Sequence, residues 1–148
     1  MTMEERLQVL EDVQAITELK ALYCDAADCG WARPLNDADG LASLFVPEGV
    51  WEAGGYGRAE GRDAIRELFR TSLYPFAFHM VTNPIIKVSG DTAIGKWHML
   101  VAHIIDEHSL WIGAIHNDEY VRTPYGWKFK AVKIALAFTG EQQWQVAK

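Results

Sequence analysis

The stretch LQVLEDVQAITELKALYCDAAD, residues Leu7 to Asp28, decides the fold because it predicts one long amphipathic helix. Its apolar residues recur at the spacing that places them along one face of a helix. That face carries Leu7, Leu10, Val13, Ile16, Leu19, Leu22 and Tyr23, followed by Ala26 and Ala27. Asp12 and Lys20 fall among the polar residues expected on the opposite side, and Gly30 predicts the end of the helix.

Short elements are expected between this helix and the second half of the chain. The segment WARPLNDADG, residues 31–40, is predicted to be a loop because it concentrates Pro, Asn, Asp and Gly. We expect a short helix over Ala38–Phe45, a turn at Pro47–Gly49 and a short strand over Val50–Ala53. Asp63 is a good N-cap for a third helix, which is expected to end before Pro75.

The second half of the chain alternates long strand-like segments with short turns. The strands are expected over His79–Val88, Thr92–Asp106, Leu110–Arg122 and Trp127–Phe138. Short turns between consecutive strands predict an antiparallel meander, and helices followed by strands predict the α+β class. We expect one domain over residues 1–148. It is a cone-shaped α+β barrel, in which three N-terminal helices pack on a strongly curved, mostly antiparallel sheet and enclose a pocket.

The composition excludes several classes of protein. Apolar residues make up 49% of the chain, which is too many for a disordered segment. A net charge of −6 without a cluster of Lys and Arg argues against a nucleic-acid partner and against anionic membranes. No apolar run is long enough to cross a membrane, and the charged start MTMEERLQVL lacks a signal-peptide core. We therefore expect a cytoplasmic protein with no membrane partner.

No metal or cofactor site is expected. Cys24 and Cys29 are the only cysteines, and two thiols make neither a disulfide framework nor a zinc pattern. The histidines form no HExxH motif, and His98 and His103 fall on opposite faces of one strand. Phosphate-loop and nucleophile-elbow motifs are absent as well. Any reaction is therefore expected to depend on side chains alone.

Several short motifs follow one another along nearly the whole chain. They are Ile16-x-x-Leu19-x-x-x-Tyr23-x-x-x-x-Asp28, Leu41–Phe45 before Val50-Trp51, Gly61-x-x-x-Ile65, His79-x-x-x-Asn83, Gly90-Asp91-x-Ala93, and Asp118–Arg122 before Gly126–Phe129. Their order resembles the SnoaL-like branch of the nuclear-transport-factor-2-like (NTF2-like) superfamily, near its scytalone dehydratase, bile-acid dehydratase and hexachlorocyclohexane dehydrochlorinase members. The resemblance implies a cavity with an Asp–His pair, whose histidine acts as the base in a cofactor-free elimination.

The resemblance also implies roles for particular positions. Asp28 and His79 match the Asp–His pair. Tyr23 occupies a position that looks like tyrosine in the bile-acid dehydratase and lysine in the dehydrochlorinase. His103 falls near a second histidine of scytalone dehydratase by spacing, and Lys133 falls near a basic residue that some members place on the last strand.

The residues themselves give a physical reason for the Asp–His pair, with an alternative for each member. Asp28 falls near a helix C-terminus, where the helix dipole disfavours a carboxylate, so a partner such as histidine is expected. The alternative is a solvated carboxylate. His79 follows the aromatic-rich stretch Tyr74–Phe78, and apolar surroundings favour a neutral imidazole, which is a suitable base near neutral pH. Its alternative is a core histidine bonded to the backbone.

Further residues are candidates for contact with a substrate. Tyr23 is either a core tyrosine with a satisfied hydroxyl or a donor to a carbonyl or leaving group. His103 and His116 lie on strand faces that line either the pocket or a subunit interface. Trp51 and Phe78 flank the candidate catalytic residues in the sequence and are expected to line an apolar cavity.

Together these features predict a cofactor-independent lyase, of dehydratase or eliminase type, that acts on a small hydrophobic cyclic molecule. The first alternative is an isomerase or polyketide-cyclase-type reaction. Ketosteroid isomerase shares the fold, but its catalytic base belongs at the position where this chain has Ala53, one residue after Glu52, and this difference disfavours an isomerase. The second is a non-catalytic ligand-binding or assembly protein. Residues Lys96–Ile105 are apolar on both strand faces, which predicts a homodimer or homotrimer.

Overall fold

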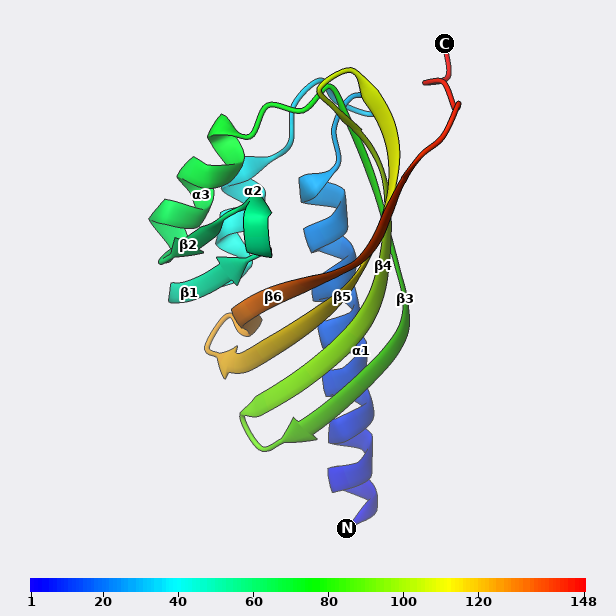
Figure 1. The fold of residues 1–148 in the computed structure, drawn as a ribbon. Helices are drawn as coiled ribbons and strands as arrows, with labels where there is room; N and C mark the ends of the chain where they lie inside the picture. Colours follow the sequence, from blue (N-terminus) through cyan, green and yellow to red (C-terminus); the bar gives the residue numbers. More distant parts are fainter.

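A computed structural model describes all residues from 1 to 148 and shows helices packed on one curved sheet (Figure 1). The helices are α1 (Met3–Ala27), α2 (Ala38–Ser43), the short 3₁₀ helix η1 (Gly54–Tyr56) and α3 (Arg62–Thr71). The strands are β1 (Phe45–Glu52), β2 (Arg58–Glu60), β3 (Phe76–Ser89), β4 (Thr92–Ile105), β5 (His108–Thr123) and β6 (Gly126–Glu141). Helix α1 runs along the sheet, while α2, α3, β1 and β2 gather at one side.

The six strands form a single sheet in the order β2-β1-β6-β5-β4-β3. The strands β3 to β6 form the antiparallel meander that the short turns predict, whereas β1 pairs with β6 in parallel. This arrangement confirms the predicted cone-shaped α+β class. The sheet stays open, because β2 and β3 lie at its two edges and do not pair with each other.

Some element boundaries differ from the predictions. Helix α2 ends at Ser43, and Phe45 already belongs to β1, which is longer than predicted. Gly61, and not Asp63, caps α3; its φ of 92° is one that glycine adopts easily, and Asp63 lies in the first turn. Strand β3 begins at Phe76, before His79.

The buried face of α1 matches the apolar pattern at Ile16, Leu19, Tyr23, Ala26 and Ala27 and differs from it elsewhere. Leu7, Leu10 and Leu22 are more than half exposed, whereas Asp12 and Lys20 are 3% and 0% exposed. The expectation that these two polar residues face solvent is therefore wrong. Each one finds a partner of opposite charge on β5, which allows it to be buried.

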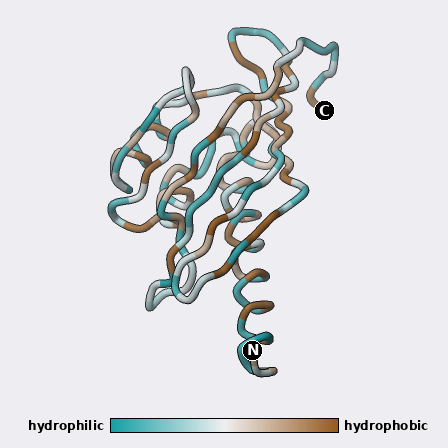
Figure 2. Tube along the Cα trace, turned by 60° about the horizontal axis from the view of Figure 1, so that its bottom comes forward, coloured by the Kyte–Doolittle hydropathy of each residue, from teal (hydrophilic) through white to brown (hydrophobic).

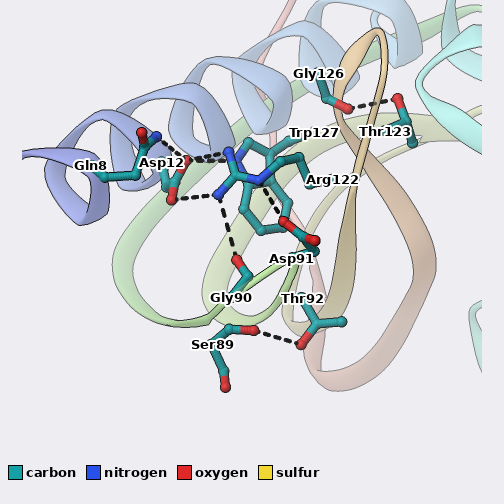
Figure 3. Close-up of polar contacts among 10 residues, drawn as sticks. All are labelled: Gln8, Asp12, Ser89, Gly90, Asp91, Thr92, Arg122, Thr123, Gly126 and Trp127. Atoms are coloured by element: carbon teal, nitrogen blue, oxygen red, sulfur yellow. Dashed lines mark hydrogen bonds and ion pairs between the residues drawn. The ribbon is translucent and has the colours of Figure 1, made fainter. Parts of the chain in front are cut away.

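Asp12 joins α1 to the sheet through a cluster of polar contacts (Figure 3). Both oxygens of Asp12 accept hydrogen bonds from the Arg122 guanidinium, each at 2.8 Å, and Oδ1 also accepts from Trp127 Nε1 at 3.0 Å. Arg122 Nε donates to Asp91 Oδ1 at 2.9 Å, in the turn between β3 and β4. The first turns of α1 project past this cluster and beyond the sheet (Figures 1 and 2).

The other end of α1 is attached to β3 just where the candidate residues lie. The backbones of Cys29 and Ala77 exchange two hydrogen bonds, with N–O distances of 3.1 and 3.0 Å. This bridge places Asp28 beside His79, since each is one or two residues away from the paired positions. No helix combines the length and apolarity that a membrane span requires.

Candidate active site

A mostly apolar pocket lies between α1, the sheet and the segment from η1 to α3. Its cavity volume is about 110 Å³, and 15 of its 20 lining residues are hydrophobic. The lining comes from every layer: Tyr23 and Ala27 from α1, Trp51 and Ala53 from and just after β1, Leu68 and Phe69 from α3, and residues of β3, β4, β5 and β6. An apolar pocket with a few polar groups in its wall is typical of a binding site for a small molecule.

The structure brings Asp28 and His79 into direct contact at this wall. His79 Nδ1 lies 2.8 Å from Asp28 Oδ1, and the same oxygen accepts the backbone N–H of His79 at 2.7 Å. A carboxylate can only accept, so Nδ1 carries the ring proton and Nε2 of the neutral ring is the free basic nitrogen. His79 lines the pocket, and Asp28 is 7% exposed behind it. The contact therefore fixes the orientation of an imidazole at the cavity.

Tyr23 lies in the same wall as a hydrogen-bond donor. Trp51 Nε1 donates to the Tyr23 hydroxyl at 2.7 Å, and the indole N–H cannot accept. The hydroxyl proton of Tyr23 is therefore available to another partner. Burial raises the pKa of Tyr23, so the hydroxyl stays protonated at neutral pH.

His103 lines the pocket as a second imidazole. It is 9% exposed, and its Nδ1 lies 3.3 Å from the carbonyl oxygen of Ile104. The ring of Tyr74 packs edge-on against it, with ring centroids 4.4 Å apart. Burial, together with the nearby His79, lowers the pKa of His103 to about 4. At neutral pH it is an uncharged group of the cavity.

His116 lines the pocket from β5 and contacts a buried ion pair. Its Nδ1 lies 2.7 Å from Lys20 Nζ, which in turn lies 2.8 Å from Asp118 Oδ2. All three side chains are at most 2% exposed. Burial lowers the pKa of His116 well below its usual value, and the Lys20 charge acts in the same direction. His116 is therefore neutral.

Two residues predicted to contact the substrate do not line this pocket. Phe78 points to the other side of β3, is 37% exposed and packs against Trp31, with ring centroids 5.3 Å apart. Lys133 is exposed on the outer face of β6, where its Nζ lies 3.6 Å from Glu119. Side chains alternate between the faces of a strand, and it is Ile134 that lines the cavity.

The sequence reasoning missed Lys20 as a residue of the site. One signal was available, because Lys20 follows Ile16 by four positions and precedes Tyr23 by three, and such residues share a helical face. A lysine at that place requires a buried carboxylate, which the local pattern does not show. Asp118 is more than ninety positions away in the chain.

The arrangement can abstract a proton and support the departure of a leaving group. Nε2 of His79 is the acceptor, Asp28 can stabilise the imidazolium that forms, and the Tyr23 hydroxyl is a donor. No three His, Cys, Asp or Glu side chains lie close enough together to hold a metal ion.

Comparison with known proteins gives one group of relatives by sequence and another by structure. An uncharacterized protein of Mycobacterium tuberculosis is 29% identical over 125 residues, which cover 80% of this chain and 81% of that protein. An NTF2-like protein with a cystatin-like fold from Novosphingobium aromaticivorans is 30% identical, with a TM-score of 0.75. The match covers 90% of this chain and 86% of that protein's chain. A hexachlorocyclohexane dehydrochlorinase (LinA, type 2) is 24% identical, with a TM-score of 0.83 and 97% of each chain covered.

The family assignment rests on the sequence as well as on the shape. The profile of the SnoaL-like domain matches residues 8–133, which include most of α1, the Asp28–His79 contact and most of the sheet. This chain therefore belongs to the SnoaL-like family of the NTF2-like superfamily.

Proposed function

We propose that this protein is a cofactor-independent lyase that eliminates water or halide from a small hydrophobic cyclic substrate. The observation that carries the proposal is the 2.8 Å contact between His79 Nδ1 and Asp28 Oδ1 at the wall of an apolar pocket. A carboxylate that fixes the ring and stabilises its cationic form makes the opposite nitrogen an effective base. Asp28, His79 and Tyr23 are the proposed catalytic residues.

The proposed step needs no external reactant. His79 Nε2 takes a proton from a substrate carbon, and the C–H electron pair becomes the new C=C bond. The bond to the leaving group breaks with its own electron pair. A halide departs as the anion, whereas a hydroxyl departs as water after taking the proton back from the His79 imidazolium. The Tyr23 hydroxyl donates a hydrogen bond to the substrate during bond cleavage.

The comparisons support an elimination, and one residue disfavours the isomerase alternative. The similar structures include a hexachlorocyclohexane dehydrochlorinase. Ala53 lines the pocket at the position where an isomerase-type carboxylate would be needed. Glu52 does not line the pocket, and its side chain pairs with Arg58 at 3.4 Å.

Two assays with defined probes test the proposal. The first measures elimination with two substrates. Ultraviolet absorbance follows the conversion of 3-hydroxycyclohexanone to cyclohexenone, and chloride release follows the reaction of hexachlorocyclohexane. The second follows exchange of the α-hydrogens of cyclohexanone in D₂O by NMR, which needs only the base. Wild-type protein should catalyse elimination and exchange, and His79→Gln should lower both rates by about 10²–10⁴-fold.

The two assays separate the alternatives. Exchange without elimination would favour an isomerase or cyclase, because those reactions share the first proton transfer. Saturable binding of cyclohexanone without exchange or elimination would identify a ligand carrier. Equal rates for the wild type and His79→Gln, with both proteins folded by circular dichroism, would rule out His79 as the base.

A further inference from the structure

One buried nitrogen of the pocket has no hydrogen-bond partner. His116 is 1% exposed and lines the cavity, and its Nε2 is without a partner although its Nδ1 lies 2.7 Å from Lys20 Nζ. An unpaired buried polar atom is costly, and in native proteins it usually has a reason. The polarity of this atom decides what it can bind.

The contacts behind His116 have only one consistent direction. Trp97 Nε1 can only donate, and it lies 3.0 Å from the Tyr120 hydroxyl. The Tyr120 proton therefore goes to Asp118 Oδ2, 2.8 Å away. That oxygen is thus an acceptor, and Lys20 Nζ donates to it at 2.8 Å.

Lys20 fixes the tautomer of His116. Burial lowers the pKa of Lys20, and the Asp118 carboxylate at 2.8 Å opposes this shift and favours the ammonium. An ammonium has no lone pair, so Lys20 Nζ, 2.7 Å from Nδ1 of His116, donates to that nitrogen. In a neutral ring the proton then resides on Nε2. Burial and the Lys20 charge both lower the pKa of His116, so the ring does not gain a second proton at neutral pH. The unpartnered atom is therefore an N–H donor.

In their neutral forms, the two imidazoles of the pocket are thus held in opposite tautomers. The Asp28 carboxylate holds the proton of His79 on Nδ1 and leaves Nε2 as an acceptor. The Lys20 ammonium occupies Nδ1 of His116 and leaves Nε2–H as a donor. One ring is prepared to take a proton, and the other is prepared to bind an electronegative atom.

We propose that His116 Nε2–H binds a carbonyl oxygen of the substrate and that Lys20 and Asp118 are positioning residues for this donor. The inference rests on the proposed lyase function and adds a substrate class, namely small cyclic carbonyl compounds that lose a proton beside the carbonyl. Removal of that proton places negative charge on the oxygen. A fixed and buried donor, with the Lys20 charge behind it, stabilises this oxyanion.

The tautomer can be measured on the wild-type protein without any variant. Long-range ¹H–¹⁵N NMR spectra of ¹⁵N-histidine-labelled protein show which ring nitrogen carries the proton. The expected result is Nε2–H for His116 and Nδ1–H for His79 at neutral pH. A proton on Nδ1 of His116, or a doubly protonated ring, would overturn the proposal.

A binding experiment tests the donor role with two matched probes. Cyclohexanone has an oxygen that only accepts hydrogen bonds, and methylenecyclohexane has the same ring without this acceptor. His116→Asn should keep an acceptor oxygen for Lys20 near the place of Nδ1 and remove the Nε2–H donor. We expect it to weaken cyclohexanone binding by about 3–10-fold and to leave methylenecyclohexane binding unchanged.

Two further variants make the outcome specific. His116→Gln can place an amide N–H near the position of Nε2 and should restore part of the cyclohexanone preference. Tyr23→Phe removes the other donor of the pocket. If His116→Asn keeps the full preference and Tyr23→Phe abolishes it, Tyr23 alone binds the oxygen and the proposal is wrong.

Failure of the lyase function gives a different pattern. His116-dependent binding of cyclohexanone without elimination in any assay would contradict the lyase proposal and retain the carbonyl-binding role. Elimination that is insensitive to His116→Asn, with unchanged ketone affinity, would retain the lyase and contradict the role of His116.

Discussion

The indole nitrogen of Trp51 lies 2.7 Å from the hydroxyl oxygen of Tyr23, and both side chains are buried at the wall of the pocket. Because Trp51 can only donate, this contact turns the Tyr23 proton toward another acceptor. The contact joins α1 to β1, which takes its place in the sheet by pairing in parallel with β6. The donor capacity of the site is therefore a consequence of sheet topology.

Tyr23→Phe should lower kcat for a substrate with a hydroxyl leaving group by about 10²-fold, since a positioned donor contributes at that level. The effect on a halide leaving group should be smaller, because a halide accepts hydrogen bonds less well. Steady-state kinetics with 3-hydroxycyclohexanone and hexachlorocyclohexane measure both. Trp51→Phe is the matched control, since it removes the N–H of the contact and keeps the Tyr23 hydroxyl. Equal losses with both substrates would contradict the donor role.

Asp28→Asn should lower kcat by about 10²–10⁴-fold with little change in fold. The amide oxygen can still accept the backbone N–H of His79, which Asp28 Oδ1 accepts at 2.7 Å. What the variant loses is the negative charge that stabilises the imidazolium. Kinetics and thermal unfolding of the same preparation test this separation. A variant with near-normal turnover would show that Asp28 acts only through the backbone contact.

The free energy of unfolding should fall as the pH is lowered from about 6.5 to about 4, because of His103. Its pKa is lowered by burial to about 4, so in this window the unfolded chain binds a proton that the folded chain does not. The stabilisation is complete above the usual histidine pKa of about 6.5 and is lost as the pH drops, by up to about 3 kcal/mol. His116 contributes in the same direction.

Urea unfolding at pH 7 and pH 4.5 measures this dependence. His103→Phe should lose less stability between the two values than the wild type, because the group that takes up the proton on unfolding is absent. His98→Gln, on the exposed outer face of β4, is the control. An identical loss in His103→Phe and the wild type would contradict the assignment.

Asp12→Asn should lower the free energy of unfolding by about 2–3 kcal/mol at pH 7, because Asp12 accepts charge-assisted bonds from Arg122. Hydrogen bonding to Arg122 lowers the pKa of Asp12 below its usual 3.8. The stabilisation is therefore present above about pH 4 and is lost as the pH falls through the lowered pKa. Urea titrations at pH 7 and pH 2.5 should show that the difference in the free energy of unfolding between Asp12→Asn and the wild type is smaller at pH 2.5. Asp91→Asn, at the exposed end of the cluster, should cost less than about 1 kcal/mol.

Local patterns predicted most elements of the fold. The strand segments and their turns predicted the meander of β3 to β6, and the α+β class followed from the order of helices and strands. Strand β2 and the parallel pairing of β1 with β6 were not predicted. Such contacts join segments far apart in the chain, and neither turn residues nor periodicity encode them.

The sequence was a better guide to which residues could act in the site than to where their side chains lie. Asp28, His79 and Tyr23 were selected through the resemblance and their local context, and the structure brings the first two into contact. Phe78 and Lys133 were selected by proximity in sequence or by position on the last strand. The side of a strand that a residue faces depends on register, and both lie outside the pocket.

The sequence by itself determined that this chain makes a long helix, short connecting helices and a meander, since these depend on periodicity and turn chemistry. Only the tertiary structure decided that polar residues of α1 are buried beside its apolar ones. Lys20 and Asp12 are polar residues that a local pattern assigns to solvent, yet both are inside, because Asp118 and Arg122 supply opposite charges from β5. A buried charge requires a partner, and a partner about a hundred residues away exists only once the sheet has formed.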